Sequence, residues 1–250
     1  MKQPREGVKS PLPTVCFQKG GIPLNAWLNK LNETFIVSGG YRLILEGLGN
    51  TIIITLGALL IGVVIGSLIA IAKYFSEESP RLKFLSLLCD LYTTVIRGIP
   101  ITVLLLIFYL VLLVSAADLT VAILAFGINS GAYMAELIRS GINAVDKGQM
   151  EAGRSLGMSK GQTMFLVILP QAVRYILPAI GNEFIALVKE TSVAGYVTIV
   201  DLTRAGNLVR NNTYDALNPL LLVALIYLTL VFFLTKLMDA LEKKLATNGK

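Results

Sequence analysis

The chain has 250 residues, of which 54% are hydrophobic and 15% are charged, and its mean hydropathy is +0.70. Soluble domains carry about 25% charged residues, so this composition excludes an ordinary soluble protein and indicates a polytopic membrane protein. The net charge is +6, but no basic run or basic–aromatic patch is present, and nucleic-acid binding is not expected. The chain lacks histidine and its two cysteines, Cys16 and Cys89, are far apart, so neither a metal site nor a disulfide is expected.

Residues 1–46 are predicted to form an extracytoplasmic tail that contains one amphipathic helix. No apolar core follows the basic start of the tail, so a secretory signal is not expected. Later in the tail, apolar residues recur at helical spacing: Leu24, Trp27, Leu28, Leu31 and Phe35. This stripe predicts a short helix in the bilayer interface with Trp27 at headgroup level or, alternatively, a helix packed on protein.

Three uncharged stretches predict the first three membrane spans. Residues 48–72 are long enough to cross about 30 Å of hydrocarbon. Small residues on this span recur every four positions and would let another helix approach closely: Ala58, Gly62, Gly66 and Ala70. The second span is expected to begin near Ser86 and to kink at Pro100, and the third to cover residues 119–135. Glu136 and Arg139, one turn apart, are expected to pair at the end of that helix.

A polar loop, residues 143–172, separates the third and fourth spans. Asp146 is expected in the first turn of a loop helix, where the helix dipole favours a carboxylate. Gly157 is expected to supply the left-handed residue that ends this helix. Gly153 in its middle costs about 1 kcal/mol relative to alanine, which is tolerable if the backbone lies close to another element.

The fourth span has a broken pattern, and the fifth is clean. We expect an interfacial piece up to about Val173, a membrane helix from about Pro178, and a polar turn at residues 201–215. Residues 216–235 predict the fifth span. Glu183 and its neighbour Asn182 lie in the fourth span. A carboxylate there is expected to face a polar cavity and a cationic substrate, or to form an ion pair with Lys189 or Arg174.

Five spans place the two ends of the chain on opposite sides of the membrane. Eleven basic residues fall on the side of the polar loop: Lys73, Arg81, Lys83, Arg139, Lys147, Arg154, Lys160, Lys236, Lys243, Lys244 and Lys250. The loops on the other side hold only Arg204 and Arg210. The positive-inside rule therefore predicts an external N-terminus and a cytoplasmic C-terminal tail at 241–250. The five spans predict an all-α transmembrane domain over residues 47–240.

The sequence contains no set of residues that would make the chain an enzyme. It has no G-x-x-x-x-G-K-[ST] phosphate loop, Ser/His/Asp set, metal cluster or paired catalytic carboxylates. ATP hydrolysis by the chain alone is therefore not expected, and function must arise from a pathway, a gate or a partner.

Four segments carry a family resemblance. Residues 145–178 read VDKGQMEAGRSLGMSKGQTMFLVILPQAVRYILP and resemble the cytoplasmic EAA loop of binding-protein-dependent ABC importer permeases, in the polar amino acid (histidine, glutamine or arginine) subfamily. NSGAYMAE at 129–136, RGIP at 97–100 and LVKETS at 187–192 resemble further motifs of that subfamily. Gly153 replaces the second alanine of EAA, and Asp146 replaces the proline usual before KGQ.

The resemblance implies a permease subunit in a bacterial inner membrane that works by alternating access. Its partners would be an ATP-binding cassette subunit that holds ATP and Mg²⁺, a solute-binding protein that delivers an amino acid near residues 201–215, and a second permease copy or a homologue. The residues expected to couple to the ATPase are Glu151, Ala152, Gly153, Arg154, Ser155, Leu156, Gly157 and Met158. The residues expected to bind substrate are Asn182, Glu183, Asn129 and Tyr133. The alternatives are an ion-coupled secondary transporter and an integral-membrane enzyme or assembly factor.

Overall fold

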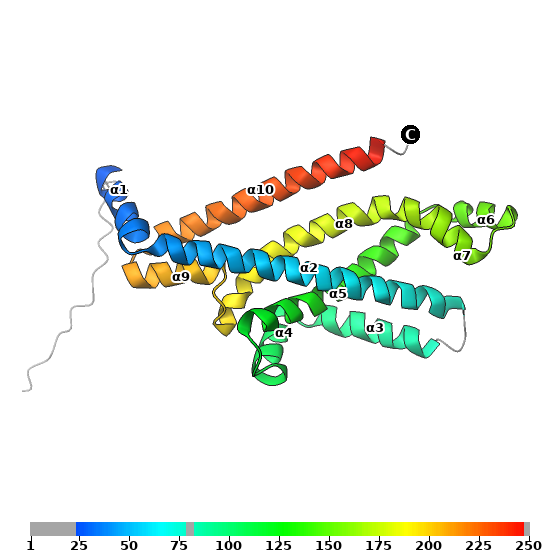
Figure 1. The fold of residues 1–250 in the computed structure, drawn as a ribbon, viewed down its shortest axis with the longest axis horizontal. Coiled ribbons are helices and arrows are strands. Elements are labelled where there is room, and N and C mark those ends of the chain that lie inside the picture. Colours follow the sequence, from blue (N-terminus) through cyan, green and yellow to red (C-terminus); the bar gives the residue numbers. More distant parts are fainter. Residues whose placement is uncertain (1–23, 79–82, 248–250) are drawn as a thin grey trace, which may run out of the picture.

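The computed structural model describes residues 24–78 and 83–247, and this part of the chain forms an elongated bundle of helices (Figure 1). Four helical stretches are long and apolar enough to cross a membrane: Gly40–Ser76, Asp118–Asn143, Lys160–Val197 and Asn218–Leu245. Lys83–Gly98 and Ile101–Leu112, which are bent by 105° relative to each other, make a fifth span when the two are counted as one. The predicted all-α fold with five membrane-spanning segments is confirmed. Cys16, Arg81, Lys250 and the first 21 residues lie outside the described residues.

The long helices are α2, α3, α5, α8 and α10, and shorter elements connect them. Their bounds are α2 (Gly40–Glu78), α3 (Lys83–Gly98), α5 (Asp118–Asn143), α8 (Leu169–Glu190) and α10 (Asn218–Thr247). The short helices are α1 (Leu24–Asn32), α4 (Ile101–Ile107), α6 (Lys147–Ser155), α7 (Lys160–Thr163) and α9 (Leu202–Thr213). Short segments of other helical types are η1 (Glu33–Val37), η3 (Phe108–Leu112), η4 (Met164–Ile168) and η5 (Thr191–Val197).

The stripe of small residues predicted in the first span packs against α5. A Cβ atom added to Gly66 would lie 2.4 Å from Cβ of Met134, and one added to Gly62 would lie 2.7 Å from Oγ of Ser130. Ala58 is fully buried between the same helices. Within hydrocarbon such close backbone contact provides the van der Waals attraction that the hydrophobic effect supplies in water. The prediction of close helix approach along this stripe is confirmed.

The two ends of the bundle carry different elements. The loop formed by α6 and α7 lies at the same end as the C-terminal end of α10, and α1 and α9 lie at the opposite end (Figure 1). A cluster of buried residues fills the middle of the bundle, where Ile54, Leu105 and Phe126 from α2, α4 and α5 meet. The polar loop, which contains α6 and α7, therefore lies at one end of the packed helix bundle.

The fourth span differs from its prediction, because it contains no break at Pro178. α8 runs through Pro178 as one helix from Leu169 to Glu190, and the preceding η4 and α7 join it into one apolar stretch. The expected separate interfacial piece up to Val173 is wrong. A proline inside a helix leaves one carbonyl without its usual donor, and membrane helices tolerate this loss where neighbouring groups take it up.

The expected polar turn at residues 201–215 is also wrong, because most of it is the helix α9. Asp201 caps the helix, its carboxylate accepting hydrogen bonds from the backbone N–H of Thr203 at 2.8 Å and of Arg204 at 3.0 Å. The apolar face of α9 packs against α2 and α10, and its residues Leu202, Ala205 and Val209 are buried there. The apolar residues of α9 recur at helical spacing between polar ones, so they form one apolar face. Packing of this face stabilises the helix, although the polar composition of the segment is typical of a turn.

Three predicted boundaries also differ from the structure. α2 begins at Gly40, so the expected boundary between residues 46 and 47 falls inside it. α5 continues to Asn143, so the Glu136–Arg139 pair lies inside the helix rather than at its end, although the pair itself is confirmed (Nε to Oε2, 3.1 Å). The predicted interruption before Pro100 is observed, but the chain bends there by 105° and starts the new helix α4 rather than kinking one helix. The carbonyl oxygen of Pro100 accepts hydrogen bonds from the amides of Val103 and Leu104.

The amphipathic segment before α2 is tied to the start of α10. Trp27 on α1 donates a hydrogen bond from Nε1 to Oδ1 of Asn218 at 3.0 Å. Thr34 is buried and donates to Oδ2 of Asp215 at 2.9 Å. The side chains of α1 are otherwise largely exposed. The sequence allowed α1 to lie in the bilayer interface or to pack on protein, and the hydrogen bond of Trp27 shows a contact with protein at that residue.

Candidate functional site

The loop helix α6 is fixed at both ends by its own sequence. Asp146 is its N-cap, and its Oδ1 accepts a hydrogen bond from the amide of Gly148 at 2.6 Å. Gly157 has a φ of +83° and ends the helix. The amide of Met158 donates to the carbonyl of Gly153 at 3.2 Å, and the amide of Gly157 donates to that of Arg154 at 3.0 Å. These two bonds form a Schellman motif, which confirms the predicted role of Gly157.

Gly153 is required where α6 crosses α7. A Cβ atom at this position would lie 2.4 Å from Cγ2 and 2.8 Å from Oγ1 of Thr163, and Thr163 is fully buried. α7 is held by a capping box, in which Ser159 and Gln162 exchange side-chain and backbone hydrogen bonds. The predicted reason for a glycine in mid-helix, close approach of another element, is confirmed by this contact.

The remaining expected coupling residues lie on the outer surface of the loop. Glu151, Ala152, Arg154, Ser155, Leu156 and Gly157 are exposed, Met158 is half-buried, and only Gly153 is buried. Leu156 is 82% exposed at the tip, next to the end of α6. Arg154 donates from Nη1 to the carbonyl of Met158 at 2.8 Å, which holds its side chain along the turn. The turn therefore presents Leu156 at the tip of the molecule on a backbone that is held by hydrogen bonds.

The loop is joined to the membrane helices by polar and apolar contacts beneath it. Gln171 of α8 donates to Oε1 of Gln149 on α6 at 3.3 Å. A cavity of about 640 Å³ opens between α6, the end of α5 and η4, and Met150 and Ile168 are among its lining residues. The hydrogen bond from Gln171 therefore links α6 directly to α8, and Met150 packs against the buried cluster that contains Ile138 and Ile168.

Glu183 faces α5 from the middle of α8. Its Oε1 accepts a hydrogen bond from Oγ of Ser130 at 3.3 Å, and the side chain is half-buried. In the described part of the chain Glu183 forms no ion pair, so the alternative pairings with Arg174 and Lys189 are not observed. In a continuous helix Arg174 is nine residues away, about 13 Å along the axis, which is too far for direct contact. Ser130, within the NSGAYMAE motif, is a partner that the sequence did not single out.

The other three expected substrate residues are spread over two helices. Asn182 on α8 is exposed, whereas Asn129 on α5 is 4% exposed and buried in the bundle. Tyr133 is half-buried, one turn further along α5, and the guanidinium of Arg97 lies 5.3 Å from the centre of its ring. The structure therefore links Glu183 to α5 through Ser130, with Tyr133 one turn from that contact.

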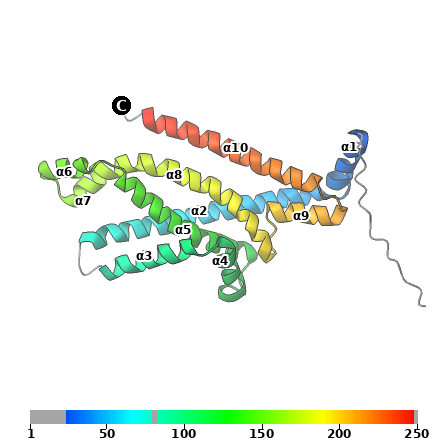
Figure 2. The same ribbon diagram turned by 180° about the vertical axis from the view of Figure 1, so that it is seen from behind.

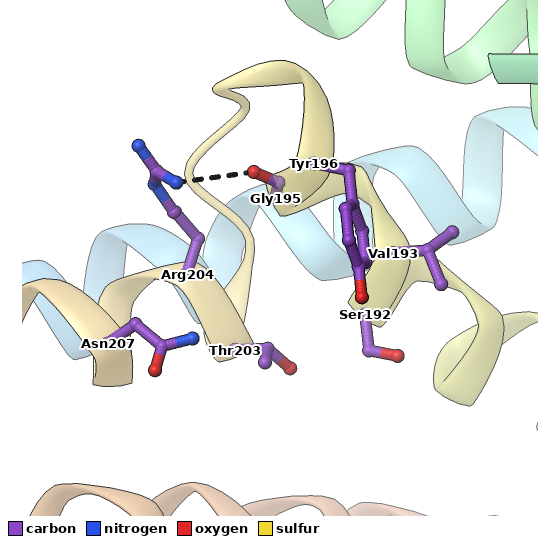
Figure 3. Close-up of a pocket in the computed structure, with 7 residues that line it drawn as sticks. All are labelled: Ser192, Val193, Gly195, Tyr196, Thr203, Arg204 and Asn207. Atoms are coloured by element: carbon purple, nitrogen blue, oxygen red, sulfur yellow. Dashed lines mark hydrogen bonds between the residues drawn. The ribbon is translucent and has the colours of Figure 1, made fainter. Parts of the chain in front are cut away.

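A second polar site lies at the opposite end of the bundle from α6. A cavity of about 530 Å³ opens between η5 and α9 (Figure 3). Its lining residues are Ser192, Val193, Gly195, Tyr196, Thr203, Arg204 and Asn207. Thr203 and Asn207 face Ser192 across it, and the Arg204 guanidinium donates to the carbonyl oxygen of Gly195 at 3.4 Å (Figure 3). One cation among hydroxyl and amide groups suits an anionic group such as a carboxylate.

A buried polar network holds α9 in place beside this cavity. The amide of Leu202 donates to Oγ1 of Thr51 at 3.0 Å, and Asn50 donates to the carbonyl of Val200 at 2.8 Å. Burial raises the pKa of the Asp201 carboxyl, while the hydrogen bonds from the backbone of Thr203 and Arg204 act in the opposite direction. The sequence marked residues 201–215 only as a polar turn and gave no sign of this cavity.

Comparison with known proteins agrees with this architecture. Residues 62–247 match the family described as "Binding-protein-dependent transport system inner membrane component". The chain is 38% identical over 209 residues to the arginine transport system permease protein ArtQ of Bacillus subtilis, covering 82% of this chain and 93% of ArtQ. It is 35% identical over 209 residues to the putative glutamine transport system permease protein GlnP of Rickettsia typhi, covering 82% of this chain and 94% of GlnP. The solved structure "Crystal structure of an amino acid ABC transporter with histidines" superposes with a TM-score of 0.77 at 38% identity, covering 83% of this chain and 96% of that chain.

Proposed function

The chain belongs to the family of inner membrane components of binding-protein-dependent transport systems, and on this basis we propose that it is the permease subunit of an ATP-driven importer of polar amino acids. Relatives named for arginine and glutamine transport, and the likeness to an amino acid ABC transporter, support the substrate class. The alternative, an ion-coupled secondary transporter, is not favoured by this membership. The chain is a transport subunit, and ATP and Mg²⁺ are held by a partner subunit.

The observation that carries this proposal is the rigid, exposed turn at the tip of α6. Leu156 and the exposed residues around it would contact the ATP-binding cassette subunit. Their backbone is fixed by the Asp146 cap and the Gly157 turn, so that movement of the partner moves the loop as a unit. Gln149 and the close contact at Gly153 would pass this movement to α8 and α7. Alternating access follows if two such permease subunits rock relative to one another.

The distribution of basic side chains supports a cytoplasmic location for the α6 end. The elements at that end carry the basic residues Lys73, Lys83, Arg139, Lys147, Arg154, Lys160, Lys236, Lys243 and Lys244. The elements at the other end carry Lys30, Arg42, Arg204 and Arg210. Since basic residues accumulate on the cytoplasmic side of bacterial inner membranes, the C-terminal end of α10 is cytoplasmic and α1 is external in this proposal.

The cavity between η5 and α9 would then open on the external side, where a solute-binding protein delivers its substrate. Every amino acid carries an α-carboxylate, and Arg204 with Ser192 and Asn207 offers donors for such a group. Further along the path, Glu183 is a carboxylate within a membrane-spanning helix and favours a cationic side chain, with Asn182, Asn129 and Tyr133 nearby in the two helices. A basic amino acid is therefore the proposed preferred substrate.

Uptake into proteoliposomes tests the proposal. The chain is reconstituted with its ATP-binding subunit and solute-binding protein, and uptake of arginine, lysine, histidine, glutamine and cystine is measured with and without ATP on the α6 side. Uptake that depends on ATP and on the binding protein is expected. Leu156→Ala should lower ATP-driven uptake about fivefold, whereas Leu228→Ala, an exposed leucine in the middle of α10, should leave it unchanged. Uptake driven by an ion gradient without the ATPase would refute the proposal.

A further inference from the structure

The segment that precedes α2 lies across one end of the bundle and carries an apolar surface. α1 and η1 run at a steep angle to α2, at the end where α9 and the start of α10 lie (Figure 1, Figure 2). Leu28, Ile36 and Val37 of this segment are 49%, 62% and 74% exposed. These large apolar side chains stand next to a membrane-spanning helix, yet the described part of the chain leaves them uncovered.

Hydrogen bonds and a close backbone contact fix this segment in its position. Nε1 of Trp27 donates to Asn218 at 3.0 Å, and Oγ1 of the buried Thr34 donates to Asp215 at 2.9 Å. A Cβ atom at Gly40 would lie 2.5 Å from the carbonyl oxygen of Thr34, so η1 touches the first turn of α2. The segment is therefore held in one orientation against the starts of α2 and α10.

The contact of Trp27 sets the depth of α1 relative to the membrane. Asn218 begins α10, and residues 219–235 that follow it carry no charge. Because such a run crosses the hydrocarbon core, the boundary of the core lies close to Asn218. Trp27 is therefore level with that boundary, where tryptophan and tyrosine side chains are enriched in membrane proteins. Tyr41 in the first turn of α2 is exposed as well.

The exposed apolar surface continues along α2 into the membrane. Tyr41, Leu45, Ile52 and Leu56 are all exposed, and their spacing of four and seven residues places them on one side of the helix. Ile52 and Leu56 lie within the uncharged stretch 48–72 that spans the hydrocarbon. One side of α2 therefore leads from the bilayer interior up to η1.

Polar side chains occupy the opposite side of α1. Lys30 comes two residues after Leu28 and therefore projects about 200° away from it around the helix. Glu33, three residues after Lys30, is exposed next to it. An apolar strip with polar residues opposite is typical of a helix that lies in the plane of a bilayer interface. Because Lys30 and Glu33 have opposite charges, this surface does not select for anionic lipids.

We propose that α1 and η1 dock on the phospholipid surface and anchor the starts of α2 and α10 at the bilayer interface. Leu28, Ile36 and Val37 would enter the boundary between headgroups and acyl chains, and Lys30 would remain in water. Phospholipid is the partner because the apolar surface is continuous with a side of α2 that spans the hydrocarbon. Docking rests on this geometry, and only its assignment to the outer leaflet rests on the proposed function.

Collision accessibility of spin labels in proteoliposomes tests the proposal. The full chain carries Cys16→Ser and Cys89→Ser, is assembled with a cysteine-free ATP-binding subunit, and is labelled at one introduced cysteine at a time. Labels at Leu28→Cys and Ile36→Cys should collide with oxygen, which dissolves in hydrocarbon, and should lose collisions with a water-soluble nickel complex. The matched controls are Lys30→Cys on the opposite side of α1 and Asn212→Cys at the exposed end of α9, and their labels should collide with nickel.

Trp27 gives a second measurement that needs no cysteine, because it is the single tryptophan of the chain. Its emission is the difference between the wild-type complex and the Trp27→Phe complex. Phospholipid brominated near the headgroup should quench this emission more strongly than phospholipid brominated at the chain end.

Three outcomes would overturn the proposal. Nickel collisions at Leu28→Cys and Ile36→Cys would place α1 in water. Labels that meet neither oxygen nor nickel would show that a second permease copy or another protein covers the surface. Any other order of quenching of Trp27 would remove it from the headgroup level. Neither measurement involves ATP or uptake, so each of these results would leave the proposed import function standing.

Discussion

Gly153→Ala should disturb the loop formed by α6 and α7, although alanine is the better helix former. The added methyl group would lie 2.4 Å from Cγ2 of Thr163, closer than real Cβ contacts, so α6 and α7 must move apart. Forcing a methyl group into a packed contact costs about 1–3 kcal/mol. The gain in helix propensity offsets about 1 kcal/mol of this. The net destabilisation of the α6–α7 contact should therefore be about 1 kcal/mol.

The assay compares ATP hydrolysis with uptake in proteoliposomes, together with the thermal unfolding midpoint of the complex. Gly153→Ala should lower the amino acid taken up per ATP hydrolysed and lower the midpoint. Gly161→Ala is the matched control, because a Cβ there meets nothing within 4 Å, and it should leave both values unchanged or raise the midpoint. Thr163→Ala removes the two closest atoms and should partly rescue Gly153→Ala, giving a non-additive double variant. Strictly additive effects, or a normal coupling ratio in Gly153→Ala, would refute the steric reasoning.

Four other changes give distinct outcomes. Asp146→Ala should destabilise the loop helix by about 1 kcal/mol, and hydrogen exchange of the α6 amides should then be faster. Asp146→Ser retains a capping oxygen, so its α6 amides should exchange at the wild-type rate. Glu183→Gln should reduce uptake of basic amino acids about tenfold while glutamine uptake is spared, and equal loss of both would argue against charge recognition. Arg204→Gln should raise the amino acid concentration needed for half-maximal uptake about tenfold, whereas Arg204→Lys should retain most of the affinity. An unchanged half-maximal concentration in Arg204→Gln would show that Arg204 does not bind the substrate. Asp215 is buried, which raises the pKa of its carboxyl, but hydrogen bonds led by that from Asn218 outweigh burial and hold the pKa below its usual value. Its stabilising effect is therefore complete above about pH 4 and is lost as the pH falls through the lowered pKa, so the stability difference between wild type and Asp215→Asn should shrink only in that acidic range.

The sequence was sufficient for features that depend on local chemistry. Hydropathy located the spans, because each must be apolar over the thickness of a bilayer. The spacing of small residues from Ala58 to Ala70 predicted the face of α2 that α5 contacts. Asp146 and Gly157 marked the two ends of the loop helix, because capping requires a side-chain acceptor at one end and a left-handed residue at the other.

Features that depend on tertiary contacts were predicted less well. α9 carries many polar residues and looks like a turn, yet packing of Leu202 and Val209 against α2 and α10 makes it a helix. Pro178 was expected to interrupt the fourth span, but flanking helical segments continue through it. The partner of Glu183 also needed the structure, because Ser130 is 53 residues away in the chain and reaches it only through the packing of α5 on α8. The cavity around Arg204 lies between η5 and α9, and no local sequence pattern predicts that these two elements lie close together.

The reciprocal packing of α2 and α5 has a mechanical consequence. Gly62 and Gly66 on α2 receive Ser130 and Met134, while Gly127 and Gly131 on α5 receive Ile61 and Ile65. Side chains of each helix thus fill the space above glycines of the other helix, so neither helix can slide along the other without breaking several of these contacts at once. The pair should behave as a single stiff rod, with one end carrying α6 and the other reaching α9 through Thr51. A displacement of the α6 end of this pair would then be transmitted to its α9 end, and the bending required for each transport cycle would occur in the remaining helices.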